Sequence, residues 1–588
     1  MNTTLTRTRK TEEGSSLFLV MTLIVIAFLM LASALSWSQN NALTIARNNQ
    51  YWRTIAAAEA ATEKVYARLH DDFQLNGETT VYNNSQGTAY YTTVPTAADS
   101  GYWSSYVFSD GQGRNNQTYV ALVPGTRTNW TVLNTQYAGL SAIADTYQIK
   151  SYARDSQARF NLSAGVQQNI QPSSIPVFQD AIFYNVDLEI EPGPNMTVTG
   201  RVHSNGNIYQ VPGATLTYQS DVTSSGVITN ADMPGDPNVS VSPGTVVYRG
   251  AHTSKTPTLT LPIAGGNDPT TAYEIIKPPP VGGDTDPALA GERYYNKADI
   301  LITVTDGLIT AKSGSLNLFA TPIVNLPAGT VTSYTNRFYN GRELKGVNVI
   351  DIDVNKFKTW ADDSSVVTGS GNLLALYGRE PNSIYVLDQR NLPAGTEKGV
   401  RLINGAQLPN GGLTVATQDP LYVKGDFNIK DSTGTSSGSD TTHTKPASLA
   451  GDAITVLSSA FDDTKNTSSL GNLKSAAGTT VNAAFLAGIV KTTPSSYSGG
   501  VENFPRFLED WNLNGSKTLT YNGSMVVLFY SQIATGLWNG TGIYYNAPLR
   551  NWTFDNNFMN PMKLPPGTPT FRFVLRSDWF TLGKDPTS

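Results

Sequence analysis

The feature that most constrains this chain is a long uncharged stretch near its start, residues 15–46. At its centre, residues 17–35 read LFLVMTLIVIAFLMLASAL, nineteen positions without a charge. A single membrane-spanning helix needs about 20 apolar residues, so this run is long enough to cross a bilayer once. The leader before it, residues 1–14, carries Arg7, Arg9 and Lys10. This basic leader predicts a cytoplasmic N-terminus and places the rest of the chain outside the cytoplasm.

A secretory signal peptide is the main alternative for this stretch, because Ala32-Ser33-Ala34 has the small-x-small pattern of a cleavage site. The apolar core of a signal peptide is shorter, about 7–15 residues. Here helix-compatible sequence continues without a break through TIAAAEAATEKVYARL, which is rich in good helix formers. We therefore predict one retained helix over 15–75, apolar in its first half and amphipathic in its second.

The composition narrows the class of the remaining chain. At 588 residues, several domains or one elongated repeat are expected. Charged residues make up only 15%, while Gly and Tyr number 51 and 28, a palette that suits strands and turns. A net charge of −5 gives no indication of nucleic-acid binding. Cysteine is absent, which excludes disulfides and thiolate chemistry, and the histidines are few and scattered: His70, His203, His252 and His443.

The pattern after the helix predicts a mainly β protein. Residues 76–177 alternate apolar and polar positions between turns, which indicates a small antiparallel β domain. Residues 178–430 are predicted to be rich in β-solenoid, or β-helix-like, coils. Residues 431–446 are low in complexity and predict a mobile loop. Further rungs and an aromatic cap are expected over 447–588, which contains four tryptophans, Trp511, Trp538, Trp552 and Trp579.

An internal repeat supports the solenoid prediction. Residues 188–208 align with 208–228 at an offset of 20 residues. The matched pairs are Pro192/Pro212, Gly193/Gly213, Met196/Leu216, Val198/Tyr218, Val202/Val222, Ser204/Ser224, Gly206/Gly226 and Ile208/Ile228. A fixed period near 20 with short β runs is typical of stacked coils that share a core, and two neighbouring hairpins are the alternative.

The N-terminal 60 residues resemble a type IV prepilin of the PilX-like minor pilin kind. The resemblance is carried by the basic leader that ends in Gly14, the apolar helix that follows, and the segment Ala57-Ala58-Glu59-Ala60-Ala61. It implies that prepilin peptidase cleaves after Gly14 and methylates Ser15. Ser15 stands where Phe or Met is usual. The fifth mature residue is Leu19, where major pilins hold a Glu, so the resemblance implies a minor subunit, with Leu19 and Glu59 in filament packing.

Two acidic patterns are weak candidates for calcium. Asp351, Asp353, Asn355 and Asp362 imitate the oxygen spacing of a calcium loop, although Lys356 replaces the glycine such a loop requires and a solvated strand face is favoured. The acidic turn DMPGDPN, residues 232–238, is the other, and there a plain turn is favoured. No other cofactor is expected.

Acidic pairs such as Glu189/Glu191 or Asp452/Asp462 raise the alternative of a carbohydrate-active enzyme, which needs two carboxylates beside a sugar cleft. That alternative rests on fold analogy alone, and we expect no enzyme. The sequence instead predicts a minor-pilin-like structural component of a type IV pilus or related filament. Its helix would pack with other pilins in the filament core, and a large ectodomain would project, in a tip position suited to assembly initiation or adhesion. The expected location is the bacterial inner membrane before assembly and the cell surface afterwards. A type II secretion pseudopilin, and an adhesin for a surface polysaccharide or host ligand, remain alternatives.

Overall fold

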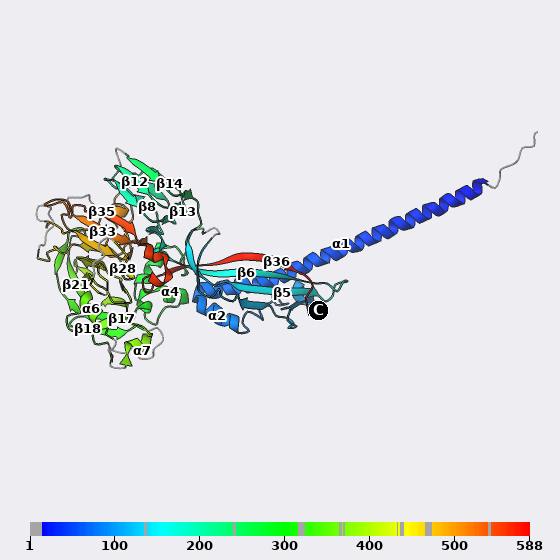
Figure 1. Ribbon diagram of the computed structural model, residues 1–588, viewed down its shortest axis with the longest axis horizontal. Helices are drawn as coiled ribbons and strands as arrows, with labels where there is room; N and C mark the ends of the chain where they lie inside the picture. The colour runs from blue at the N-terminus through cyan, green and yellow to red at the C-terminus, as the bar shows by residue number, and fades with distance from the viewer. Residues whose placement is uncertain are drawn as a thin grey trace, which may run out of the picture.

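The computed structural model describes residues 15–133, 137, 139–238, 243–314, 324–363, 367–368, 371–431, 433–434, 440–464, 473–538 and 543–587. The predicted leader 1–14, with Gly14, lies outside them, as do residues 432 and 435–439 of the predicted loop. The described chain is mainly β, with one long N-terminal helix (Figure 1). The helix projects from a small antiparallel sheet, and a larger body of β-sheets lies at the other end of that sheet (Figure 1).

Helix α1 runs from Ser15 to Asn76, a length of 62 residues. Its C-terminal half buries a stripe of residues at helical spacing: Ile55, Ala58, Ala61, Val65, Leu69 and Phe73. These residues form two apolar clusters with side chains of the antiparallel sheet. The helix ends because Gly77 takes φ +77°, and its amide donates to the Phe73 carbonyl at 2.9 Å. A short helix, α2 (Glu78–Gln86), follows.

The small β domain is an antiparallel sheet of order β1-β5-β6-β4-β3, with β2 beside β5. Its strands are β1 (Tyr106–Ser109), β2 (Tyr119–Leu122), β3 (Asn129–Val132), β4 (Ser141–Ala144), β5 (Tyr147–Asp155) and β6 (Ser163–Pro176).

The last strand of the chain, β36 (Thr570–Leu582), completes this sheet. It pairs antiparallel with β6 from Thr570↔Pro176 to Leu582↔Gly165. The prediction that the C-terminal segment caps the larger body is therefore wrong for these residues. A pairing between segments about 400 residues apart leaves no local pattern, because alternation shows that a segment is a strand but not which strand lies beside it.

Three stacks of short parallel strands follow, and they reproduce the 20-residue repeat. They contain β7 (Ile182–Tyr184), β8 (Leu188–Ile190), β9 (Met196–Val198), β10 (Val202–Ser204), β11 (Ile208–Gln210), β12 (Thr215–Tyr218), β13 (Val222–Ser224), β14 (Ile228–Thr229), β15 (Thr245–Tyr248) and β16 (His252–Ser254). Met196 lies beside Leu216, Val202 beside Val222 and Ile208 beside Ile228, as the repeat predicts.

The next step in these stacks is longer than 20 residues. Val222 pairs with His252 and Thr215 with Thr245, an offset of 30 in both cases (252 − 222 and 245 − 215). The suggested third coil at residues 230–241 does not appear as strands in its described part, 230–238. Those residues form bends and a turn, and the next rung is supplied by β15 and β16.

The rest of the body is built from two larger parallel arrays. One continues the β7 sheet through β34 (Met525–Val527), β31 (Ala484–Ala487), β28 (Ala447–Gly451), β26 (Leu413–Thr417), β24 (Ser383–Asp388), β17 (Ile300–Thr305) and the antiparallel β18 (Leu308–Ser313). The other contains β19 (Val331–Ser333), β20 (Phe338–Asn340), β21 (Lys345–Asp353), β25 (Glu397–Ile403), β27 (Leu421–Lys424), β29 (Ile454–Leu457) and β32 (Pro505–Arg506).

Smaller elements complete the body. A parallel trio comprises β30 (Thr479–Asn482), β33 (Thr518–Gly523) and β35 (Leu549–Phe554), and β22 (Val367–Thr368) pairs with β23 (Gly371–Asn372). The short helices are α3 (Pro269–Ala272), α4 (Pro287–Glu292), α5 (Tyr294–Lys297), α6 (Val354–Ala361) and α7 (Leu373–Tyr377).

The order of the 11-stranded sheet shows how the chain returns on itself. From β7 the chain moves outward to β16, reappears at the far end as β17 and β18, and returns strand by strand to β34, which pairs with β7 (Met525↔Ile182). The predicted loop 431–446 does not separate two units, because β26 and β28 on either side of it are parallel neighbours (Leu413↔Ala447).

Candidate functional site

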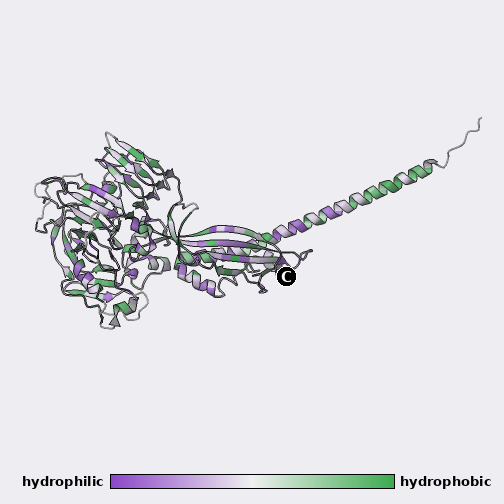
Figure 2. Ribbon diagram, in the orientation of Figure 1, coloured by the Kyte–Doolittle hydropathy of each residue, from purple (hydrophilic) through white to green (hydrophobic). Residues whose placement is uncertain are grey.

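The first functional feature is the free half of α1. An 18-residue window of this helix has a mean hydropathy of 2.8, and none of it is buried against the rest of the chain. Among the described residues, this is the one helix long and apolar enough to cross a membrane by length and composition. Figure 2 shows the apolar colour concentrated at its outer end and polar residues nearer the sheet.

The helix residues singled out from the sequence lie in different environments. Ser15 is the first residue of α1. Leu19 lies on the free half and is 62% exposed. Glu59 lies in the packed half, half-buried beside the stripe that faces the sheet. The structure thus separates an unpartnered apolar segment from a docked one along a single continuous helix.

The four calcium candidates from the sequence do not form one site. Asp351 forms a bidentate ion pair with Arg401, at 2.8 Å for both oxygens. Asp353 caps the N-terminus of α6, accepting from the Lys356 amide at 3.0 Å. Asn355 lies within α6, and Asp362, just after it, pairs with Lys358 at 3.0 Å. These residues have separate partners because the segment is a strand followed by a helix and not a calcium loop.

The acidic pair Asp452/Asp462 is also divided between two settings. Asp452 is fully buried, and its carboxylate accepts from the backbone amides of residues 532, 533 and 534 at 2.7–3.2 Å. Asp462 forms an ion pair with Lys474 at 2.5 Å. Both carboxylates have local structural partners.

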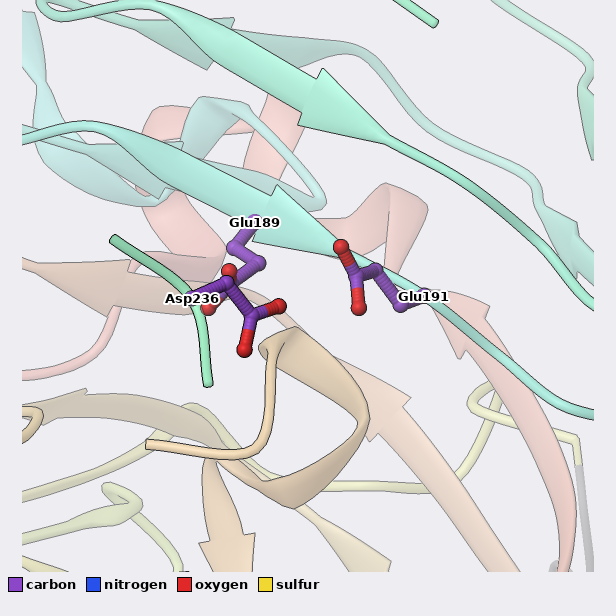
Figure 3. A group of neighbouring side chains, drawn as sticks. All are labelled: Glu189, Glu191 and Asp236. Carbon is purple, nitrogen blue, oxygen red and sulfur yellow. The ribbon is translucent and has the colours of Figure 1, made fainter. Parts of the chain in front are cut away.

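The other acidic pair, Glu189/Glu191, is joined by Asp236 from the turn 232–238. One carboxylate oxygen from each residue lies within 4.8 Å of the other two. Figure 3 shows the three carboxylates converging from β8 and from the facing turn. Glu189 and Glu191 are two positions apart at the end of β8, so their side chains leave the strand on the same side. The sequence singled out the pair and the turn separately, and the structure brings them together.

This acidic cluster, Glu189, Glu191 and Asp236, is largely buried. Glu189 is 4% exposed and Asp236 is 7% exposed, while Glu191 is half-buried. Each residue has one buried carboxylate oxygen without a hydrogen-bond partner: Glu189 Oε1, Glu191 Oε1 and Asp236 Oδ2. No ion pair to any of the three occurs within the described part of the chain. Buried carboxylates without cationic partners are costly in their charged form.

The electrostatics of the cluster follow from that burial. Desolvation, reinforced by repulsion from Glu191 and Asp236, raises the pKa of Glu189 to about 9. Desolvation and the charges of Asp236 and Glu502 raise the pKa of Glu191 to about 8. Desolvation also raises the pKa of Asp236. The like charges therefore oppose one another unless protons or a cation lie between them.

Further oxygen atoms surround the cluster. The Thr492 hydroxyl donates to Glu189 Oε2 at 3.1 Å, and the Tyr497 hydroxyl donates to Glu191 Oε2 at 3.3 Å. The Glu191 amide donates to the Glu502 carboxylate at 3.2 Å. Tyr184 is 2% exposed, and its hydroxyl has no hydrogen-bond partner although it lines a small cavity together with Glu189 and Thr492. Sequence reasoning did not single out these four surrounding residues, because they come from distant segments with no shared motif.

No protein-family model and no curated protein matches the chain. Among solved structures, it is similar to the competence-associated pilin ComZ from Thermus thermophilus, with 11% sequence identity and a TM-score of 0.28. That alignment covers 91% of this chain and 98% of the ComZ chain. Similarity at this level does not establish a shared fold.

Proposed function

We propose that this protein is a minor-pilin-like structural component of a type IV pilus or a related filament. The observation that carries the proposal is the free half of α1, which is apolar, unburied and continuous with a half that packs on a small antiparallel sheet. One continuous helix fits a filament core, because it couples an inserted segment rigidly to the domain that projects from it.

The exposed apolar surface requires a cover. Burial of apolar surface contributes about 25 cal/mol per Å², so a run of exposed side chains such as Leu19, Leu23 and Phe28 is unfavourable in water. Lipid covers it before assembly in the bacterial inner membrane, and neighbouring pilin helices replace the lipid on assembly. The resemblance of the leader and helix to PilX-like prepilins supports cleavage by prepilin peptidase between Gly14 and Ser15, with methylation of the new N-terminus.

The size of the body supports a terminal position. The sheets built from residues 178–569 lie beyond the small β domain, at the far end of the molecule from the helix tip (Figure 1). Copies stacked along a shaft would bring such bodies into collision, which favours low copy number or a tip location at the cell surface. The parallel stacks with 20-residue registers support a solenoid-like body, a form suited to adhesion to a surface polysaccharide or host ligand.

A structural role is proposed in preference to a membrane-anchored carbohydrate-active enzyme. The carboxylates considered for catalysis are engaged elsewhere, since Asp452 is held by backbone amides and Glu189 lies in the buried cluster. Retained catalytic pairs flank a sugar in a cleft. A pseudopilin of a secretion system would use the same helix in the same way, and the genes beside this one distinguish the two systems.

Intact-mass measurement and N-terminal sequencing of the protein from its own membranes test the proposal. A mature chain that begins at Ser15, with the mass of one added methyl group, is the expected result. A Gly14→Leu variant is the matched control and should retain Met1. A wild-type chain that begins at Met1, or one cut near Ala34, would contradict the proposal and indicate a signal anchor or a secreted protein.

A further inference from the structure

We propose that Glu189, Glu191 and Asp236 form a calcium site that joins two distant parts of the β body. The donor set consists of oxygen atoms alone, which is the set that Ca²⁺ prefers in proteins. Three carboxylates with no cationic partner in the described part of the chain leave an excess of buried negative charge, and a divalent cation offsets that charge directly.

The spacing of the three carboxylates matches the size of the ion. Ca²⁺ binds oxygens at about 2.3–2.6 Å, so ligands on opposite sides of it lie up to about 5 Å apart. The cluster oxygens lie within 4.8 Å of one another and fit this limit without rearrangement. Mg²⁺ binds at about 2.0–2.1 Å and holds its ligands within about 4.2 Å, so it suits the set as it stands less well.

A second observation, independent of the carboxylates, points to the same place. The Tyr184 hydroxyl is buried without a partner and lines the cavity that Glu189 and Thr492 also line. A buried hydroxyl without a partner is costly and calls for an explanation in a folded protein. An ion with its bound water in this cavity supplies one, since the water can accept from Tyr184. Ca²⁺ takes six to eight oxygens, so hydroxyls and water complete the shell.

The position of the site gives it a structural role. Glu189 and Glu191 come from β8 in the 20-residue stacks, and Asp236 comes from the turn that lengthens the next step to 30 residues. Thr492 and Tyr497 lie in the segment after β31, which belongs to the returning half of the 11-stranded sheet. A bound ion therefore connects the outward and returning parts of the chain near the point where β7 meets β34.

The test uses the full chain in detergent, stripped with EDTA and then titrated with Ca²⁺, Mg²⁺ or Tb³⁺. We expect one Ca²⁺ per chain, a higher melting temperature with Ca²⁺ than with Mg²⁺, and Tb³⁺ luminescence sensitised by the nearby tyrosines. Glu189→Gln and Asp236→Asn should each weaken Ca²⁺ binding by about tenfold or more. In EDTA both variants should melt no lower than wild type, because each removes one of three repelling charges.

Asp353→Asn is the matched control, because it removes a carboxylate from the other acidic motif and should keep the full calcium response. The proposal is overturned if wild type shows neither Ca²⁺ binding nor a calcium-dependent melting shift, which would mean that the carboxylates share protons instead. It is also overturned if both cluster variants bind Ca²⁺ as wild type does. Should one cluster variant fail to fold, the other variant and the wild-type titration decide.

Discussion

Arg572 lies at the joint between the helix, the small sheet and the large body, and its removal should loosen that joint. Its guanidinium donates to the Gln74 carbonyl at 2.9 Å and the Phe73 carbonyl at 3.3 Å, both in the last turn of α1. It also pairs with Glu292 of α4 at 3.2 Å, and the two side chains are only 12% and 3% exposed. The same residue thus caps the helix and holds a nearly buried carboxylate.

The magnitude follows from these contacts. Breaking a buried ion pair by removing one partner costs about 3–5 kcal/mol. Lys297 continues to pair with Glu292 at 2.7 Å, which places the expected cost of Arg572→Ala at the lower end, about 3 kcal/mol. Since about 1.4 kcal/mol is a factor of ten, the opening equilibrium of the joint should rise roughly a hundredfold.

Arg576→Ala is the matched control on the same strand. Arg576 makes a bidentate pair with Glu63 at 2.6 and 2.8 Å, but its side chain is 50% exposed. Exposed pairs contribute about 0–1 kcal/mol, so opening should rise less than about fivefold.

Native-state hydrogen exchange of the full chain in detergent reports both variants, at the amides of residues 73–77 and 570–573. Equal effects from the two variants, or less than a tenfold effect from Arg572→Ala, would refute this account of the joint.

Three further predictions concern the packed helix, the buried acids and the free helix. Leu69→Ala, at a position with 0% exposure, should destabilise the small domain by about 2–5 kcal/mol, whereas Leu75→Ala, at 46% exposure, should cost less than about 1 kcal/mol; hydrogen exchange along β5 and β6 measures both. Burial raises the pKa of Glu397 to about 8, above its ordinary 4.5, so its contribution favours folding most below pH 4.5 and is lost as pH rises towards 8. Calorimetry from pH 5 to 9 should therefore show a smaller fall in melting temperature for Glu397→Gln than for wild type, and parallel curves would contradict this. Leu23→Lys places a charge in the apolar run at a cost of about 3 kcal/mol and should deplete the protein from the membrane fraction, while Asn41→Lys should not; equal fractionation of the two variants would show that this half of the helix is not inserted.

The local parts of this fold could be predicted from the sequence. The helix is apparent because its apolar run and Ala-rich continuation are contiguous, and Gly77 ends it one residue beyond the predicted limit of 75. The registers of the first stacks followed from the 20-residue repeat, since identical offsets between parallel strands place equivalent residues side by side, as for Val202 and Val222.

The long-range parts could not be predicted in this way. The pairing of β36 with β6, and of β34 with β7, joins strands whose sequences show alternation but no partner. The acidic cluster was found in halves for the same reason. Glu189 and Glu191 were evident as a pair on one strand, and Asp236 as part of an acidic turn, but only the longer third step of the stack brings the turn over β8.

Photo-crosslinking from the free half of α1 in living cells tests the central claim most directly. A photo-crosslinking amino acid is placed at Leu23, 56% exposed on the helix, and as a control at Val132, 65% exposed on β3. In filaments sheared from the cell surface, we predict that position 23 captures the apolar N-terminal segment of another pilin and that position 132 does not. Absence of the protein from sheared filaments, or capture by position 23 of lipid alone, would contradict a helix that packs in a filament core.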